Sequence, residues 1–333
     1  MQPNKSNQPS QDARFDALTQ WASEQLNEAV QLVPASSDAS FRRYFRAQTQ
    51  ENTTFVLMDA PPERENSAAF LEVAERLQQV GVAAPKIYGV DLTQGFMLLE
   101  DLGRNTWLQA LGSHNAETFF SLAIDALIQM QQAKTTGLPS YNAELLHLEL
   151  SLFTDWYLAH HLQVQLPPAL AKDYQVACEL LVQSALAQPQ VFVHRDYMPR
   201  NLMVGTPNPR VIDFQDAVLG PITYDLASLY KDAFLSWPQT LIDKGVQEYW
   251  QKARAAGLPV IEDKARFQQQ LDWMGIQRHL KVIGIFARIY YRDGKDHYLG
   301  DVPRFFTYLA EVVPQYSELA PLQRVLDWVV AQQ

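Results

Sequence analysis

Three polar residues, set at fixed spacing among short apolar runs, constrain this chain more than any other feature. The apolar runs are typical of buried strand pieces, and functional groups are then expected where those strands end. The first run leads into His194-Arg195-Asp196. Asn201 stands five residues after Asp196, and Asp213 follows the last run, twelve residues after Asn201. The apolar runs are residues 191–193, 202–204 and 211–212.

This pattern predicts phosphoryl transfer. Such a reaction makes few covalent demands, so the enzyme mainly orients the attacking hydroxyl and neutralises charge with metal ions. Asp196 suits the first task, because a carboxylate at the start of a loop can accept a hydroxyl proton. Asn201 and Asp213 suit the second, because Mg²⁺ prefers hard oxygen ligands beside phosphate oxygens. The alternative is a turn-forming Asp between strands, but two fixed spacings within apolar brackets favour the phosphotransferase site.

Composition narrows the class of protein further. A length of 333 residues favours two lobes or domains. The net charge of -10 argues against a nucleic-acid partner, which would call for a basic face. One cysteine, Cys178, excludes an intramolecular disulfide, and we expect a reducing cytoplasm and a core position for this residue. No run approaches the length of a membrane helix, so no membrane partner is expected.

Several stretches carry apolar residues three and four apart, which is the periodicity of one helix face. The first of them covers residues 15–32, and Pro34 is expected to end it, because the residue before a proline disfavours the helical conformation. The later stretches predict a helical second half of the chain. They are residues 116–130, 150–162, 169–186, 271–286 and 322–330.

Over nearly its whole length the chain resembles the aminoglycoside phosphotransferase and choline kinase superfamily. It is most similar to the bacterial anomeric sugar kinases that act on N-acetylmuramate and N-acetylglucosamine in cell-wall recycling. The resemblance implies an α+β, bilobal, protein-kinase-like fold, with a flexible tail at 1–14, a small β-rich N-lobe at 15–103 and a helical C-lobe at 104–333. It is carried by residues 40–46, 58–62, 98–103 and 213–217, together with the motif above.

The same resemblance implies roles for individual residues. Asp196 would meet the substrate hydroxyl, while Asn201 and Asp213 would hold Mg²⁺. His194 and Asp225 would support the catalytic loop. Main-chain groups of Glu100 and Leu102, at the hinge between the lobes, would meet the adenine of ATP.

The nucleotide loop is expected at residues 35–41, where small polar residues would let backbone N–H groups approach phosphates. Ser37 and Ser40 are the candidates, and an ordinary Ser-rich hairpin is the alternative. The strand position where related kinases carry a phosphate-binding lysine holds Met58. Our hypothesis is that Arg42 or Arg43, on opposite faces of the adjacent strand, replaces that lysine.

The helix after Pro62 would supply a glutamate to pair with that lysine. Because the lysine is missing, Glu65, Glu72 and Glu75 are interpreted as a solvated acidic face.

Candidate acceptor-binding cations occur late in the chain. Arg278 and Lys281 interrupt an apolar helical segment and would suit the lactyl carboxylate of N-acetylmuramate. A basic helical surface is the alternative. Arg200, inside the catalytic motif, is a third candidate.

The sequence therefore predicts a monomeric cytoplasmic kinase that transfers the γ-phosphoryl group of ATP, with Mg²⁺, to the anomeric hydroxyl of an N-acetylated amino sugar. The rivals are a kinase for another small acceptor, such as an aminoglycoside, choline, ethanolamine or homoserine, and a non-catalytic kinase-like binding module. The intact set of Asp196, Asn201 and Asp213 argues against the binding module.

Overall fold

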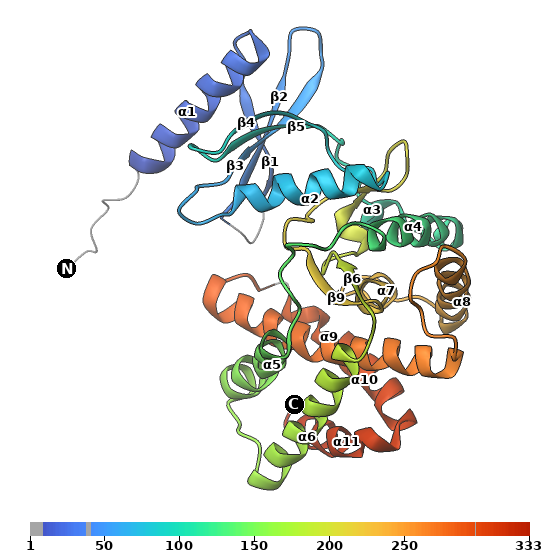
Figure 1. Cartoon of the computed structure of the whole chain (residues 1–333). Helices are drawn as coiled ribbons and strands as arrows, with labels where there is room; N and C mark the ends of the chain where they lie inside the picture. Colours follow the sequence, from blue (N-terminus) through green and yellow to red (C-terminus); the bar gives the residue numbers. More distant parts are fainter. Residues whose placement is uncertain (1–8, 38–40, 297) are drawn as a thin grey trace, which may run out of the picture.

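The computed structural model describes residues 9–37, 41–296 and 298–333. The chain forms two lobes, as expected (Figure 1). A five-stranded sheet with two helices makes the smaller lobe, and a larger, mainly helical lobe lies beneath it (Figure 1). This is the bilobal, kinase-like α+β architecture that the sequence predicts.

The N-lobe sheet is antiparallel throughout, with strand order β1-β2-β3-β5-β4. Each strand follows its neighbour in sequence except that β5 lies between β3 and β4. The sheet therefore brings the end of β5, where the chain leaves this lobe, next to the start of β3. The strands are β1 Leu32–Ser37, β2 Arg43–Gln48, β3 Thr54–Asp59, β4 Ile87–Asp91 and β5 Phe96–Glu100.

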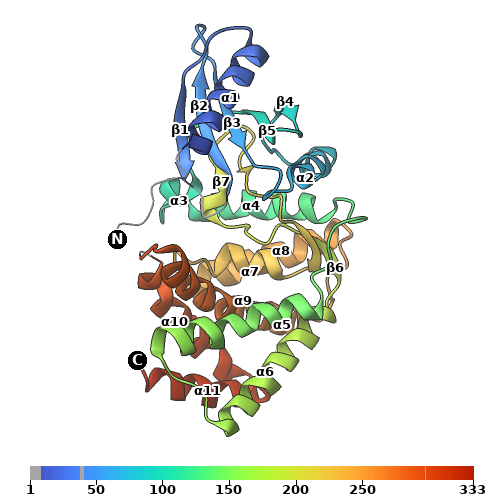
Figure 2. The same cartoon turned by 90° about the vertical axis from the view of Figure 1, so that its left-hand side faces the viewer.

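The two faces of this sheet bury different helices. Alternate strand residues point to opposite faces, so Leu57 packs in the cluster that includes α1 (Pro9–Leu26), while Met58 packs in the cluster that includes α2 (Ser67–Gln79). Figure 1 shows α1 on one side of this sheet and α2 on the other, and Figure 2 shows the same lobe turned by 90°. The α2 face continues into the core of the C-lobe, so residues on it can reach the space between the lobes.

The first helix differs from the prediction at both ends. It begins at Pro9, so residues 9–14 of the expected flexible tail are helical, and residues 1–8 lie outside the described residues. It ends at Leu26, because Asn27 adopts a left-handed conformation with φ 56°. The following residues cross to the sheet, and Pro34 lies in β1 beside an irregularity in the strand pairing. The apolar residues at 29–32 therefore belong to a connection and a strand.

The C-lobe is organised around one long helix, α9 (Lys264–Asp293). The predicted segment 271–286 is its interior, where nearly every side chain is buried because α5, α6, α7, α10 and the η1 segment all pack against it. The predicted helix at 150–162 is divided between α5 and η1, a π-helical segment. The other helices are α3 Trp107–Ala110, α4 Ala116–Gln131, α5 Ala143–Leu152, η1 Phe153–Leu162, α6 Pro168–Leu186, α7 Tyr224–Tyr230, α8 Gln239–Ala255, α10 Val302–Val312 and α11 Ala320–Val330.

Two short two-stranded sheets lie near the junction of the lobes, and the second of them is a hairpin. β6 (Gln190–Val193) pairs with β9 (Val218–Pro221), and β7 (Leu202–Met203) pairs with β8 (Arg210–Val211). The prediction that residues 191–193, 202–204 and 211–212 contain buried strands is confirmed for the first run and for most of the others. The β7/β8 hairpin touches the N-lobe, because the Val211 N–H donates to the Ala83 carbonyl at 2.7 Å.

The structure also addresses the expectations for membrane-spanning helices and for Cys178. Within the described ranges, no helix has both the length and the apolar character needed to cross a bilayer. Cys178 is a buried core residue of α6, and burial raises the pKa of its thiol to about 12.

Candidate active site

The catalytic loop runs from the end of β6 to the start of β7 and carries the predicted motif. One residue of this loop and one residue after β8 have positive φ angles although neither is glycine. Arg195 has φ 76°, and Asp213, just after β8, has φ 64°. Left-handed conformations at such residues cost free energy and persist only where the surroundings over-determine them.

Asp225, at the start of α7, fixes the beginning of this loop. Its buried carboxylate accepts hydrogen bonds from the backbone N–H groups of His194, at 2.7 Å, and Arg195, at 3.0 Å. Burial raises the pKa of Asp225 to about 6, although His194 and these two N–H groups act to lower it. The supporting role expected for Asp225 has a clear geometric basis.

The ring of His194 makes further contacts that hold this loop. Its Nε2 lies 3.0 Å from the Ile212 carbonyl, so this nitrogen carries the proton and donates. Its Nδ1 then accepts from the Asp196 N–H at 3.3 Å. The buried ring thus links the catalytic loop to the chain just before Asp213.

Asn201 connects the predicted base to the predicted metal ligand. Its Nδ2 donates to the Asp196 carbonyl at 2.9 Å and to Asp213 Oδ2 at 3.3 Å. Since the amide nitrogen is directed at these two acceptors, Asn201 Oδ1 remains as a hard oxygen ligand. Gln215 Nε2 donates to the other Asp213 oxygen at 2.8 Å, which orients that carboxylate.

The donor set fits Mg²⁺. The oxygens of Asn201 and Asp213 are the ligand type that this ion prefers. No group of three or more His, Cys, Asp or Glu side chains in the described ranges is arranged to hold a metal ion. An ion supported by two protein ligands would take the rest of its shell from phosphate oxygens and water, as Mg²⁺ commonly does.

On the nucleotide side, the structure separates the two candidate arginines. Arg43 lies on the α1 face, where it forms an ion pair with the buried carboxylate of Asp59. Asp59 also pairs with Arg14 at 2.6 Å. Arg42 forms an ion pair with Glu65 at 2.8 Å, and both side chains are about 10% exposed.

Arg42 also lies close enough to the predicted metal ligand Asp213 to be affected by its charge. Burial alone would lower the pKa of its guanidinium, but the negative fields of Tyr44, Glu65, Asp216 and Asp213 raise it. The prediction of a solvated acidic face is therefore wrong for Glu65, because this residue is largely buried against Arg42 just before α2. It holds for Glu72 and Glu75, which lie at the surface of α2.

The remaining nucleotide-loop and hinge candidates are only partly described. Ser37 ends β1, and Ser40 lies outside the described residues. The Glu100 side chain is bound by the Arg210 guanidinium through two contacts of 2.5 and 2.6 Å, which connects the hinge to the β7/β8 hairpin. The Glu100 N–H also donates to the Lys86 carbonyl at 2.8 Å. The contact of adenine with main-chain groups of Glu100 and Leu102 stays a prediction.

The three predicted acceptor cations have different surroundings. Arg200 is exposed, with its guanidinium 4.8 Å from the centre of the Phe234 ring. Arg278 is 2% exposed and donates to the Lys231 carbonyl at 3.2 Å. Lys281 is 8% exposed and pairs with Glu149 at 2.7 Å. The alternative of a basic helical surface is wrong, because packing on all sides of α9 buries both of its cations.

From the sequence, Glu65 was interpreted as part of a solvated face, and Glu149 was not singled out. Glu65 lies just before a helix whose other glutamates are solvated, and nothing local distinguishes it. Glu149 lies in α5, far in sequence from the Arg195 and Lys281 that it binds. Its signal was an acidic residue inside an apolar helical stretch, since a buried carboxylate needs a cationic partner.

Known proteins are similar to this chain over most of its length. Residues 31–261 match the model of the phosphotransferase enzyme family. Among curated proteins, the chain is 51% identical over 329 residues to the N-acetylmuramate/N-acetylglucosamine kinase of Pseudomonas aeruginosa, which covers 95% of this chain and 97% of that protein. The protein of the same name from Neisseria meningitidis is 45% identical over 88% of each chain.

Solved structures agree in fold. Choline kinase LicA from Streptococcus pneumoniae superposes with a TM-score of 0.61 and 17% identity, covering 89% of this chain and 99% of that one. The ADP-bound aminoglycoside phosphotransferase APH(2'')-Ib gives a TM-score of 0.58 and 14% identity, covering 89% and 98%. The family model and the curated relatives match most of the sequence, so the chain belongs to the phosphotransferase enzyme family.

Proposed function

We propose that this protein is an ATP-dependent kinase that phosphorylates the anomeric hydroxyl of N-acetylmuramate and N-acetylglucosamine, giving sugar 1-phosphates for peptidoglycan recycling. The observation that carries the proposal is the identity of 45–51%, over 88–96% of the chain, with proteins named as kinases of these two sugars. The catalytic loop supports it, because the carboxylate and both metal-ligand candidates are present and joined through Asn201.

Asp196 is the residue that meets the acceptor. Its main chain is held on both sides, by the His194 ring at its N–H and by the Asn201 amide at its carbonyl. Holding the main chain limits where the carboxylate can lie. That carboxylate orients the attacking hydroxyl and accepts its proton as the new oxygen–phosphorus bond forms and the bond from the γ-phosphorus to the ADP oxygen breaks. An anomeric hydroxyl is more acidic than an ordinary alcohol, so it places little demand on the strength of the base.

Asn201 Oδ1 and the Asp213 carboxylate would hold Mg²⁺. When bound, this ion neutralises charge on the phosphate oxygens. The hydrogen bond from Gln215 orients one oxygen of Asp213. The hydrogen bond from the Asn201 amide to the other oxygen holds the two candidate ligands next to each other.

On the ATP side, we assign the role of the missing strand lysine to Arg42. It shares the α2 face with Met58, it pairs with a glutamate preceding α2, and it lies in the field of Asp213. A lysine paired with a glutamate serves related kinases in this way. Ser37 and Ser40 would border the phosphates, and the hinge main chain at Glu100 and Leu102 would meet adenine.

For the acceptor carboxylate of N-acetylmuramate, Arg200 is the best placed of the three cations, because it is exposed and lies between Asp196 and Asn201 in sequence. Arg278 and Lys281 are buried and engaged, Arg278 with the Lys231 carbonyl and Lys281 with Glu149, so neither is as accessible to a substrate as Arg200. An Arg200→Ala variant is therefore expected to lose activity on N-acetylmuramate while keeping activity on N-acetylglucosamine, which lacks the carboxylate.

The test of function is ATP consumption with Mg²⁺ across N-acetylmuramate, N-acetylglucosamine, kanamycin, choline and homoserine, with Asp196→Asn as the control. We expect turnover on the two sugars, abolished in the control, and a product phosphate that is labile to mild acid because it sits at the anomeric position. Turnover on an amine with silent sugars would overturn the proposal. We also propose a monomer acting in the cytoplasm, where ATP is available, and light scattering of the purified protein tests the first point.

A further inference from the structure

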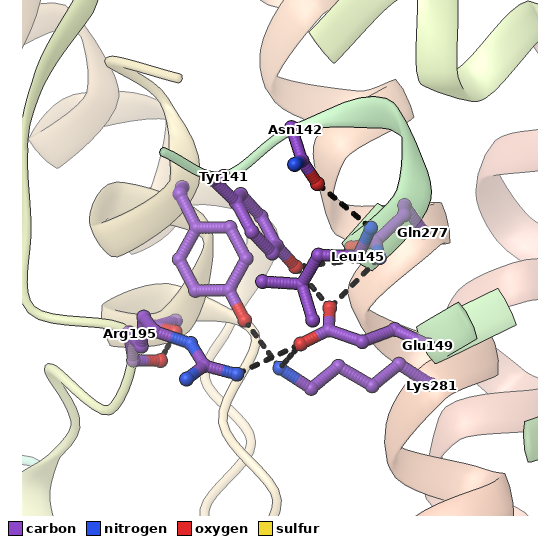
Figure 3. Close-up of polar contacts among 9 residues, drawn as sticks. Tyr141, Asn142, Leu145, Glu149, Arg195, Gln277 and Lys281 are labelled. Carbon is purple, nitrogen blue, oxygen red and sulfur yellow. Dashed lines mark hydrogen bonds and ion pairs between the residues drawn. The ribbon is translucent and has the colours of Figure 1, made fainter. Parts of the chain in front are cut away.

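A buried cluster of charged residues lies directly behind the catalytic loop. At its centre is Glu149 of α5, which is 4% exposed. Its Oε1 receives Arg195 Nη2 from the loop at 2.8 Å and Lys281 Nζ from α9 at 2.7 Å. Figure 3 shows both cations reaching the same carboxylate oxygen of Glu149.

The other carboxylate oxygen is bound by neutral donors. The Tyr141 hydroxyl and Gln277 Nε2, the latter at 3.2 Å, both donate to Glu149 Oε2 (Figure 3). Lys281 makes a further hydrogen bond to the Tyr224 hydroxyl at 3.0 Å. A carboxylate with hydrogen-bond donors at both oxygens is held in one position, and the side chains that bind it are held in place with it.

The cluster has a net positive charge unless the nearby carboxylate of Asp196 is counted with it. Arg195 and Lys281 contribute two positive charges and Glu149 one negative charge. Burial alone would lower the pKa of the Lys281 ammonium, but Tyr224, Glu149 and Asp196 raise it above its ordinary value. Asp196 also acts electrostatically on Arg195. The cluster is thus close enough to Asp196 for the two to influence each other.

Arg195 connects the cluster to the reaction. It precedes Asp196 in sequence and adopts the left-handed φ of 76°. Asp225 holds its backbone N–H, but this contact leaves the side chain free to turn. The ion pair with Glu149 fixes the side chain as well, so that the strained residue is held at both its backbone and its guanidinium.

From this geometry we propose that Glu149 and Lys281 are positioning residues, which act through Arg195 to hold the catalytic loop in the conformation that presents Asp196 to the acceptor. The proposal rests on the kinase function above for its kinetic readout. Neither residue needs to touch a substrate to act in this way.

The test uses a pair of substitutions that keeps the charge of the cluster. Glu149→Gln alone leaves two buried cations without a carboxylate and is expected to reduce stability. Adding Lys281→Met removes one of those cations, so E149Q/K281M carries the same net charge as the natural cluster and similar packing. In this double variant Arg195 has lost its ionic partner while the fold is retained.

The matched control is Asp272→Asn. Asp272, on α9, forms a comparably buried ion pair with Lys231 at 3.0 Å, and it makes no contact with the catalytic loop. It therefore reports what the loss of one buried carboxylate does to the fold alone.

Two measurements are made on the full-length protein. With ATP and the sugar acceptor, we expect kcat of E149Q/K281M to fall roughly 10- to 100-fold, while KM for ATP stays within about twofold, since small displacements of a reacting group have effects of this size. Hydrogen exchange of a peptide spanning residues 194–201 is expected to accelerate by about tenfold or more. D272N should show neither change.

The outcomes separate the two proposals. Natural kcat and natural exchange in E149Q/K281M would overturn the positioning role, as would equal losses in D272N. The exchange measurement needs no acceptor, so it tests the role of the cluster even if the natural protein proves inactive on the sugars, a result that would count against the proposed function alone.

Discussion

Replacing Arg42 is the most informative single change on the nucleotide side. Arg42→Met removes the guanidinium but keeps most of the length and packing of the side chain. The structure gives this arginine a Glu65 partner at 2.8 Å on the face that leads to Asp213, and it ties Arg43 to Asp59 on the opposite face. Arg43→Met is therefore a control that differs by one position and by the direction of the side chain.

The size of the effect follows from these contacts. Removing Arg42 leaves the largely buried Glu65 carboxylate without its ionic partner, so R42M should cost about 1–3 kcal/mol of folding stability. A guanidinium contact with phosphate is a charge-assisted interaction of about 2–3 kcal/mol, so kcat/KM for ATP should fall roughly 30- to 150-fold. The double variant R42M/E65Q guards against an effect of the unpaired carboxylate and should show the same loss.

The assay is steady-state kinetics at saturating sugar, with ATP varied, supported by calorimetry of ATP binding without acceptor. For R43M we expect less than about threefold change, because Asp59 keeps Arg14 and the side chain points away from the nucleotide. Arg42→Lys should retain part of the activity, since an ammonium is the group that related kinases use. If R42M behaves like R43M in both assays, the assignment of Arg42 is wrong.

Three further predictions follow from the structure. Asp196→Asn should lower kcat about 10²- to 10⁴-fold at unchanged KM for ATP, and turnover within tenfold of the natural protein would contradict its role. Gly95→Ala should lower the free energy of unfolding by about 3 kcal/mol or more in urea titrations, because φ is 73° and the added Cβ would overlap the Ala60 carbonyl oxygen. An unchanged urea midpoint would rule this out. Burial raises the pKa of Asp232 from 3.8 to about 6, so between pH 4 and pH 6 the native state binds a proton that the unfolded state releases. Stability should therefore fall as pH rises through this window, by up to about 3 kcal/mol, and Asp232→Asn should remove that part of the slope; equal slopes in both proteins would exclude it.

The catalytic loop was predictable from sequence because its determinants are local. Asp196 and Asn201 are five residues apart and Asp213 follows a short hairpin, so the motif itself fixes which groups meet. The apolar runs around them predicted short buried strands, and β6, β7 and β8 cover most of these residues. The two-lobe architecture followed equally well from length, from the periodicity of the second half and from the family resemblance.

Element boundaries were less secure. The apolar pattern of the first helix continues past Leu26, but Asn27 turns the chain, and the residues after it find partners in β2. Hydrophobic periodicity records that a residue is buried; it does not record whether a helix neighbour or a strand neighbour buries it.

What the sequence determined by itself was the spacing of the candidate site residues, the lobe order and the expectation that Arg42 and Arg43 point in opposite directions. Tertiary structure decided which of these arginines lies on the α2 face beside Glu65, because strand alternation separates two faces but only the packing of α1 and α2 tells them apart. It also decided that Glu65 is paired and that Arg278 and Lys281 are buried. These outcomes depend on contacts between residues far apart in the chain, such as those of Glu149 with Arg195 and Lys281. Such partners set the free energy of a buried charge. A local sequence pattern does not encode them.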